Sequence, residues 1–204
     1  MIDRFQKLFT SLHLEVICAP FWAMPTSDQG TNFTYANANT QISGDQSRGG
    51  CVSFRANTSN VDNMLFSIGS SLKSWTGGCN SNFVLNVGGS SIMNVYGMCS
   101  SYDNYNIPVG SSVLFDGNFH QVCVSYDNTI PQLCVYLDLL SPRCVNRTNP
   151  RYNTSLGDVR VGWWPDGNRR FSGSGGGLIR SVTLFSTAIN QSCVTHQYHV
   201  NNTG

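Results

Sequence analysis

The stretch FDGNFHQVCVSY, residues 115–126, decides the fold of this chain. It opens with an Asp-Gly turn signal at Asp116 and Gly117, and from Val122 to Tyr126 every second residue is apolar. Such alternation is typical of a β-strand that buries one face. Cys123 lies on the opposite face of the predicted strand from the apolar residues.

Similar short strands flank this one on both sides. The composition agrees, because Glu15 is the only glutamate and Lys7 and Lys73 are the only lysines, whereas helices draw heavily on both residue types. Short alternating runs separated by turns predict an all-β, antiparallel sandwich. The expected strands centre on residues 51–54, 64–68, 83–87, 92–96, 122–126, 133–137, 159–163 and 178–185, with a short helix near 189–198 as an option.

Eight cysteines and no Cys-x-x-Cys motif indicate disulfides rather than a thiolate zinc site. Cys51 and Cys123 each lie opposite their strand's apolar face, so we expect them to bond between neighbouring strands. A hairpin centred on Gly89 predicts a Cys79–Cys99 bridge, and one centred on Leu139 predicts Cys134–Cys144. Cys18 and Cys193 remain unassigned.

Six Asn-x-Ser/Thr sequons agree with a secreted, glycosylated chain. Residues 1–29 are expected to be a signal peptide or a poorly ordered segment, residues 30–195 the sandwich, and residues 196–204 a C-terminal tail. No apolar run is long enough for a transmembrane helix. The predicted glycosylation sites are Asn32, Asn57, Asn146, Asn153, Asn190 and Asn201.

Residues 33–187 resemble the pentraxin and laminin-G domains. The stretch 115–126 is similar to their shared block of an acid, Gly, an aromatic residue, His and Val. The stretches 51–54, 83–89, 135–138 and 178–185 resemble other strands of these families, in the same order. The resemblance implies a disulfide-bonded jelly roll that binds ligands, with His120 as a packing and hydrogen-bonding residue.

Pentraxins hold calcium through carboxylates and amides on two loops, and most of that set is missing here. Residues 76–82 contain no acidic residue. In the second loop only Asp166 falls where the family has a ligand, with Asn168 beside it. Because calcium needs six to eight oxygen ligands, the two-ion pentraxin site is not expected. A single weaker calcium site at Asp166 and Asn168 stays open, and so does a plain Asp-Gly turn.

The loop around residues 163–171 is the predicted ligand site. Exposed Trp and Arg residues are common binding anchors, and Trp stacks on sugar rings. Alternatively, Trp164 covers a sheet edge. The predicted ligand-binding residues are Trp164, Asp166, Asn168, Arg169 and Arg170.

The sequence therefore predicts a secreted recognition or adhesion module, part of a larger protein, that binds a glycan, a lipid headgroup or a protein. The alternative is a structural domain whose function is homo-oligomerisation. A carbohydrate-active enzyme is disfavoured, because the paired carboxylates of glucan hydrolases are absent. The net charge of +1 gives no indication of a nucleic-acid partner. His196 and His199 are interpreted as part of the tail rather than a zinc site.

Overall fold

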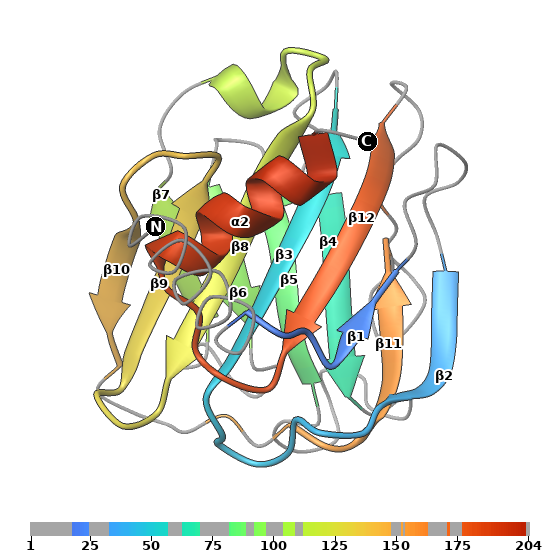
Figure 1. The fold of residues 1–204 in the computed structure, drawn as a ribbon, viewed down its shortest axis with the longest axis vertical. Coiled ribbons are helices and arrows are strands. Elements are labelled where there is room, and N and C mark those ends of the chain that lie inside the picture. The colour runs from blue at the N-terminus through green and yellow to red at the C-terminus, as the bar shows by residue number, and fades with distance from the viewer. Residues whose placement is uncertain are drawn as a thin grey trace, which may run out of the picture.

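In the computed structural model the chain forms a two-layer β-sandwich with a helix across one outer face (Figure 1). The structure describes residues 18–24, 33–56, 63–69, 82–88, 92–96, 104–108, 112–147, 152, 154–162, 171 and 177–202. All strand pairs within both sheets are antiparallel, as the alternation predicts.

The first sheet has the order β1-β12-β3-β8-β9-β10 and the second β2-β11-β4-β5-β6-β7. The first sheet comprises β1 (Trp22–Ala23), β12 (Leu178–Phe185), β3 (Arg48–Arg55), β8 (His120–Asp127), β9 (Gln132–Leu137) and β10 (Arg143–Asn146). The second comprises β2 (Phe33–Asn39), β11 (Gly157–Val161), β4 (Asn63–Gly69), β5 (Asn82–Gly88), β6 (Ile92–Tyr96) and β7 (Asn104–Pro108). A 3-10 turn, η2 (Ser112–Phe115), leads into β8.

The main core lies between the sheets and contains the predicted apolar faces of β8, β9, β11 and β12. Close packing across it demands glycine on β3. A Cβ atom on Gly50 would lie 2.7 Å from the ring of Phe66 in the opposite sheet. On the other face of the strand, a Cβ on Gly49 would lie 3.0 Å from Ile189. Two consecutive glycines therefore let both layers approach β3.

Helix α2 (Gln191–Asn202) covers the outer face of the first sheet. Asn190 caps it, because its Oδ1 accepts a hydrogen bond from the Cys193 backbone N–H at 3.0 Å. Gln121 on β8 fastens the helix: its Nε2 donates to the Val194 carbonyl, and its Oε1 accepts from Asn201 Nδ2, both at 3.0 Å. The predicted tail from residue 196 is therefore wrong for residues 196–202, which complete a packed helix.

The N-terminal boundary predicted at residue 30 is also wrong. Residues 18–24 belong to the sandwich, since β1 pairs with β12 along its edge. The backbone N–H groups of Phe21 and Met24 donate to the carbonyls of Leu184 and Val182, at 3.0 and 2.8 Å. Residues 1–17 lie outside the described residues, so a signal peptide there stays a prediction.

Two of the three predicted disulfides are confirmed. Cys51–Cys123 joins β3 to β8, and Cys134–Cys144 joins β9 to β10. The β9–β10 turn contains no glycine. Its left-handed position is occupied by Asp138, with φ of 50°, a conformation that aspartate tolerates better than most residues.

Cys79 and Cys99 lie outside the described residues, so their pairing stays a prediction. Its register argument does not hold, however. Gly88 pairs with Ile92, which centres the β5–β6 hairpin on residue 90 rather than on Gly89.

Candidate functional site

The outer face of the second sheet carries a row of polar side chains. On β11, Val159 and Val161 point into the core, so Arg160 points outward. The same parity places Asn82 and Asn86 on the outward face of β5. In the register of the sheet, Arg160 pairs with Ser67 on β4 and Ser67 pairs with Val84 on β5, the residue between Asn82 and Asn86. We call Arg160, Asn82 and Asn86 the outer polar face.

These outward residues are buried, unlike ordinary solvent-facing polar groups. Arg160 is 5% exposed, Asn86 1% and Asn82 0%. Among the residues that the structure describes, all three have buried atoms without a hydrogen-bond partner: Nη1 of Arg160, Oδ1 of Asn86, and both amide atoms of Asn82. Leaving such a group unpaired costs about 1–3 kcal/mol of stability.

Asp158 holds Arg160 in place. Its Oδ2 accepts a hydrogen bond from Arg160 Nη2 at 2.5 Å, and its Oδ1 accepts one from the Asn37 backbone N–H at 3.1 Å. Burial lowers the pKa of the Arg160 guanidinium, and the neighbouring Asp158 carboxylate partly offsets this effect. The guanidinium stays charged at neutral pH, with one edge fixed by Asp158 and Nη1 left over.

The predicted ligand loop leaves the same strand that carries Arg160. Trp164, Asp166, Asn168, Arg169 and Arg170 lie outside the described residues, so their roles as ligand-binding residues, and those of Asp166 and Asn168 in a calcium site, stay predictions. Both ends of the loop are fixed. The Phe171 backbone N–H donates to the Gly162 carbonyl at 2.7 Å, and Gly162, with φ of 73°, donates to the Leu65 carbonyl at 3.0 Å.

His120 links the start of β8 to the β9–β10 turn. Its Nδ1 contacts Asp138 Oδ2 at 2.9 Å and its Nε2 contacts Asp116 Oδ1 at 3.1 Å. Burial lowers the pKa of His120, but the hydrogen bonds to the two carboxylates outweigh burial and raise it overall. Hydrogen bonds from Asn118 hold the pKa of Asp116 down at about 2. With both ring nitrogens engaged, His120 has the packing and hydrogen-bonding role expected of it.

A second buried polar cluster closes one end of the sandwich. Arg48, 0% exposed, donates to the carbonyls of Gln46 and Gly44 and to the hydroxyl of Thr154. Its guanidinium also lies 5.6 Å from the ring centre of Tyr152. Burial lowers the pKa of Arg48 to about 10. Because these bonds are all internal, Arg48 braces the loops and offers nothing to a ligand.

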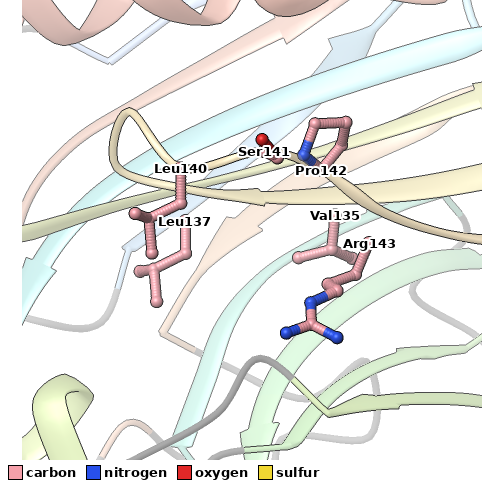
Figure 2. Close-up of a pocket in the computed structure, with 6 residues that line it drawn as sticks. All are labelled: Val135, Leu137, Leu140, Ser141, Pro142 and Arg143. Atoms are coloured by element: carbon pink, nitrogen blue, oxygen red, sulfur yellow. The ribbon is translucent and has the colours of Figure 1, made fainter.

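A shallow apolar pocket opens at the β9–β10 edge (Figure 2). Figure 2 shows the side chains of Val135, Leu137 and Leu140 pointing to the same side of the hairpin, with Arg143 beside them. Val135 and Leu137 belong to the core, whereas Leu140 is 60% exposed. The pocket therefore lies at the open edge of the sandwich, with Ser141 and Arg143 as its polar lining residues.

His196 and His199 lie on α2 and line a shallow depression there. Within the described part of the chain, no group of three His, Cys, Asp or Glu side chains is arranged to hold a metal ion. Among those residues, too, no helix is long and apolar enough to cross a membrane.

The sequons differ in accessibility. Asn146 and Asn190 are exposed, whereas Asn201 is 7% exposed and its Nδ2, the atom that would carry sugar, is hydrogen-bonded to Gln121. Asn32, Asn57 and Asn153 lie outside the described residues and stay predictions.

Comparison with solved structures identifies the architecture. The carbohydrate-binding module CBM40 of the Ruminococcus gnavus IT-sialidase, in a complex with α2,3-sialyllactose, superposes with a TM-score of 0.67 at 11% identity, covering 88% of this chain and 100% of that one. A pentraxin from Limulus polyphemus, described as SAP-like, gives a TM-score of 0.53 at 14% identity, covering 86% of this chain and 80% of that one. The fold is a pentraxin-like jelly roll.

The same fold occurs within larger proteins. The chain superposes on the leech intramolecular trans-sialidase with a TM-score of 0.66 at 15% identity, covering 89% of this chain and 28% of that one. No family model and no curated protein matches the sequence. At these identities the likeness establishes the fold alone.

Sequence reasoning missed the outer polar face. Alternation placed Arg160 opposite Val159 and Val161, which is where charged residues usually face solvent. No signal in the sequence distinguishes a solvated outward arginine from a buried one with an unpaired donor. Only the burial and the hydrogen bonds of Arg160 in the structure distinguish the two cases.

Proposed function

We propose that this domain is a glycan-binding module for carbohydrates that carry a carboxylate, such as sialylated oligosaccharides. The observation that carries the proposal is the buried Arg160, whose Nη1 lacks a partner on the same outer sheet face as the unpaired amides of Asn82 and Asn86. A sugar carboxylate would accept from the guanidinium. Hydroxyl and acetamido groups would pair with the amides, which both donate and accept.

The comparisons support this choice among the predicted ligands. The bacterial module with a similar fold has been solved with α2,3- and α2,6-sialyllactose bound. A lipid headgroup would also present an anion, but it would not use a face of paired asparagine amides as fully as a polyhydroxylated sugar. The proposal extends to the loop that follows Arg160, where Trp164 would stack on a sugar ring and Arg169 and Arg170 would contact further residues of the glycan.

The setting proposed is extracellular, with the domain as an accessory or adhesion module of a larger secreted or cell-surface protein. The disulfides Cys51–Cys123 and Cys134–Cys144 fit an oxidising compartment. The module is proposed to bind without catalysis, since the bacterial structures of similar fold that match it over their whole length are carbohydrate-binding modules.

The experiment is calorimetric titration with 3′-sialyllactose, with lactose as the uncharged comparison. We expect binding of the first and none of the second. Arg160→Gln removes the cation. Loss of a charge-assisted hydrogen bond of about 1.5–3 kcal/mol should weaken binding about 10- to 150-fold.

Two control variants separate a loss of ligand contacts from a loss of folding. Arg180→Gln removes an arginine of the first sheet, one that stacks on Phe119 at 3.7 Å, and should leave affinity unchanged. Because Arg160 is buried, circular dichroism must show that its variant is folded, and Asn86→Ala provides an independent, uncharged change on the same face. Equal binding of lactose and sialyllactose, or release of free sialic acid, would contradict the proposal.

A further inference from the structure

The N-terminal segment and helix α2 converge on one apolar cluster at the outer face of the first sheet. Residues 18–24 reach it along β12, where the Phe21 backbone N–H bonds to the Leu184 carbonyl at 3.0 Å. Helix α2 follows β12 along the chain, and Val194 is held over β8 by Gln121. The cluster contains Cys18 and Cys193 together with the Cys51–Cys123 disulfide, Cys134, Tyr136, Phe185, Ile189 and Val194.

Cys18 and Cys193 meet inside this cluster. Cys18 is 4% exposed and Cys193 0%, and both belong to this one cluster, where each thiol shifts the pKa of the other. They are free thiols in this structure, whereas Cys51, Cys123, Cys134 and Cys144 are all bonded. Among the described cysteines, therefore, these two are the remaining pair, and each has the other as its neighbour.

We infer that Cys18 and Cys193 form a disulfide that clamps the N-terminal edge strand to helix α2. Strand β1 has only two residues and pairs with β12 alone, so backbone bonds hold it weakly. A covalent bond through Cys18 would fix that edge, and through Cys193 it would fix the first turn of α2 over β3 and β8. The inference is independent of the proposed glycan site, which lies on the other sheet.

The oxidation balances with a disulfide oxidant such as glutathione disulfide or an oxidoreductase of the secretory pathway. One cysteine, as thiolate, attacks the oxidant, breaking its S–S bond and forming a mixed disulfide. The second displaces the remaining oxidant sulfur, forming the Cys18–Cys193 bond. The two electrons and two protons of the cysteine thiols end on the two thiols that the oxidant releases.

The surroundings favour closure before the helix packs. Burial raises the pKa of both the Cys18 and the Cys193 thiol, so few thiolates are present once the cluster has formed. The same burial would shield the finished bond from external reductants. We therefore expect the bond to form during folding and to resist reduction until the domain unfolds.

The test is peptide mapping of the full chain secreted from eukaryotic cells, alkylated under denaturing conditions without reduction. After removal of N-linked sugar, trypsin should release residues 8–48 and 181–204 as one cross-linked species that separates on reduction. Alkylated Cys18 and Cys193, pairing of either with another cysteine, or a secreted chain that lacks Cys18 would each overturn the inference.

Counting alkylatable thiols in single-cysteine variants provides a second measurement, which can be read even when a variant folds incompletely. Cys18→Ala should expose one new alkylatable thiol, at Cys193, and Cys193→Ala should expose one at Cys18. Cys144→Ala is the matched control, because it should free Cys134 and leave the other two protected. Protection of Cys193 that persists in the denatured Cys18→Ala variant would refute the pairing.

Discussion

The two confirmed disulfides close loops of very different length, and this difference predicts unequal contributions to stability. Cys51–Cys123 spans 72 residues, whereas Cys134–Cys144 spans 10. In the chain-entropy model the longer loop restricts the unfolded chain more, which gives about 4.4 kcal/mol for the first bridge and about 2.7 kcal/mol for the second.

The burial of Cys51 and Cys123 should increase the difference in stabilisation between the two bridges. Cys51 and Cys123 are 1% and 0% exposed under helix α2, so removing their sulfur atoms also leaves a small cavity. Cys144, by contrast, is exposed. The paired replacement Cys51→Ala with Cys123→Ala should therefore lose at least about 1.7 kcal/mol more than the paired replacement at 134 and 144.

The assay is urea unfolding followed by tryptophan fluorescence, with the free energy of unfolding extrapolated to water for each double variant. Both cysteines of a bridge are replaced together, so that no odd thiol invites mispairing. Equal losses, or a larger loss from the short bridge, would refute the reasoning that links loop length and burial to stability.

Three further predictions follow from other contacts. Because the pKa of His120 is raised in the folded state, its ion pairs should stabilise the domain fully below about pH 6.5 and less as the pH rises through the folded pKa. The Tm measured from pH 5.5 to 8.5 should therefore fall more for the natural chain than for His120→Gln. Parallel slopes of Tm against pH for the two proteins would contradict this. Gly50→Ala should cost about 1–3 kcal/mol in chemical unfolding, since its Cβ would overlap Phe66; an unchanged midpoint would show that the ring moves aside freely. Glycopeptide mapping of secreted chain should find sugar at Asn190 and none at Asn201, whose amide is buried; occupancy of Asn201 would mean that helix α2 docks after glycosylation or not at all.

Much of the sandwich was predictable because its strands obey a simple period. The alternation from Val122 to Tyr126 fixed which face of β8 is buried, and the same reasoning brought Cys51 opposite Cys123. The β5–β6 hairpin was missed by one residue, because glycines mark a turn without fixing its centre.

Helix α2 was harder to predict, because its buried face is chemically mixed. Cys193, Val194, Gln197 and Asn201 face the sheet with helical spacing, but two of the four are amides. A hydropathy pattern cannot identify such a face as buried. In the structure, Gln121 hydrogen-bonds to Asn201 and to the Val194 carbonyl, which explains how an amide can be buried there. The outer polar face escaped prediction for a related reason: the pairing of a polar side chain is a property of its neighbours in space.

Asp138 serves two parts of the molecule at once, and this restricts what evolution or an engineer can place there. It takes the left-handed turn conformation, accepts from the Gln121 backbone N–H at 2.8 Å, and contacts His120. Glycine would adopt the left-handed conformation easily but would lose the hydrogen bonds to Gln121 and His120. Glutamate could still contact His120 but would adopt the left-handed conformation less readily. Saturation mutagenesis at this codon should thus return asparagine as the best-tolerated substitute, with a narrower spectrum than its surface location suggests.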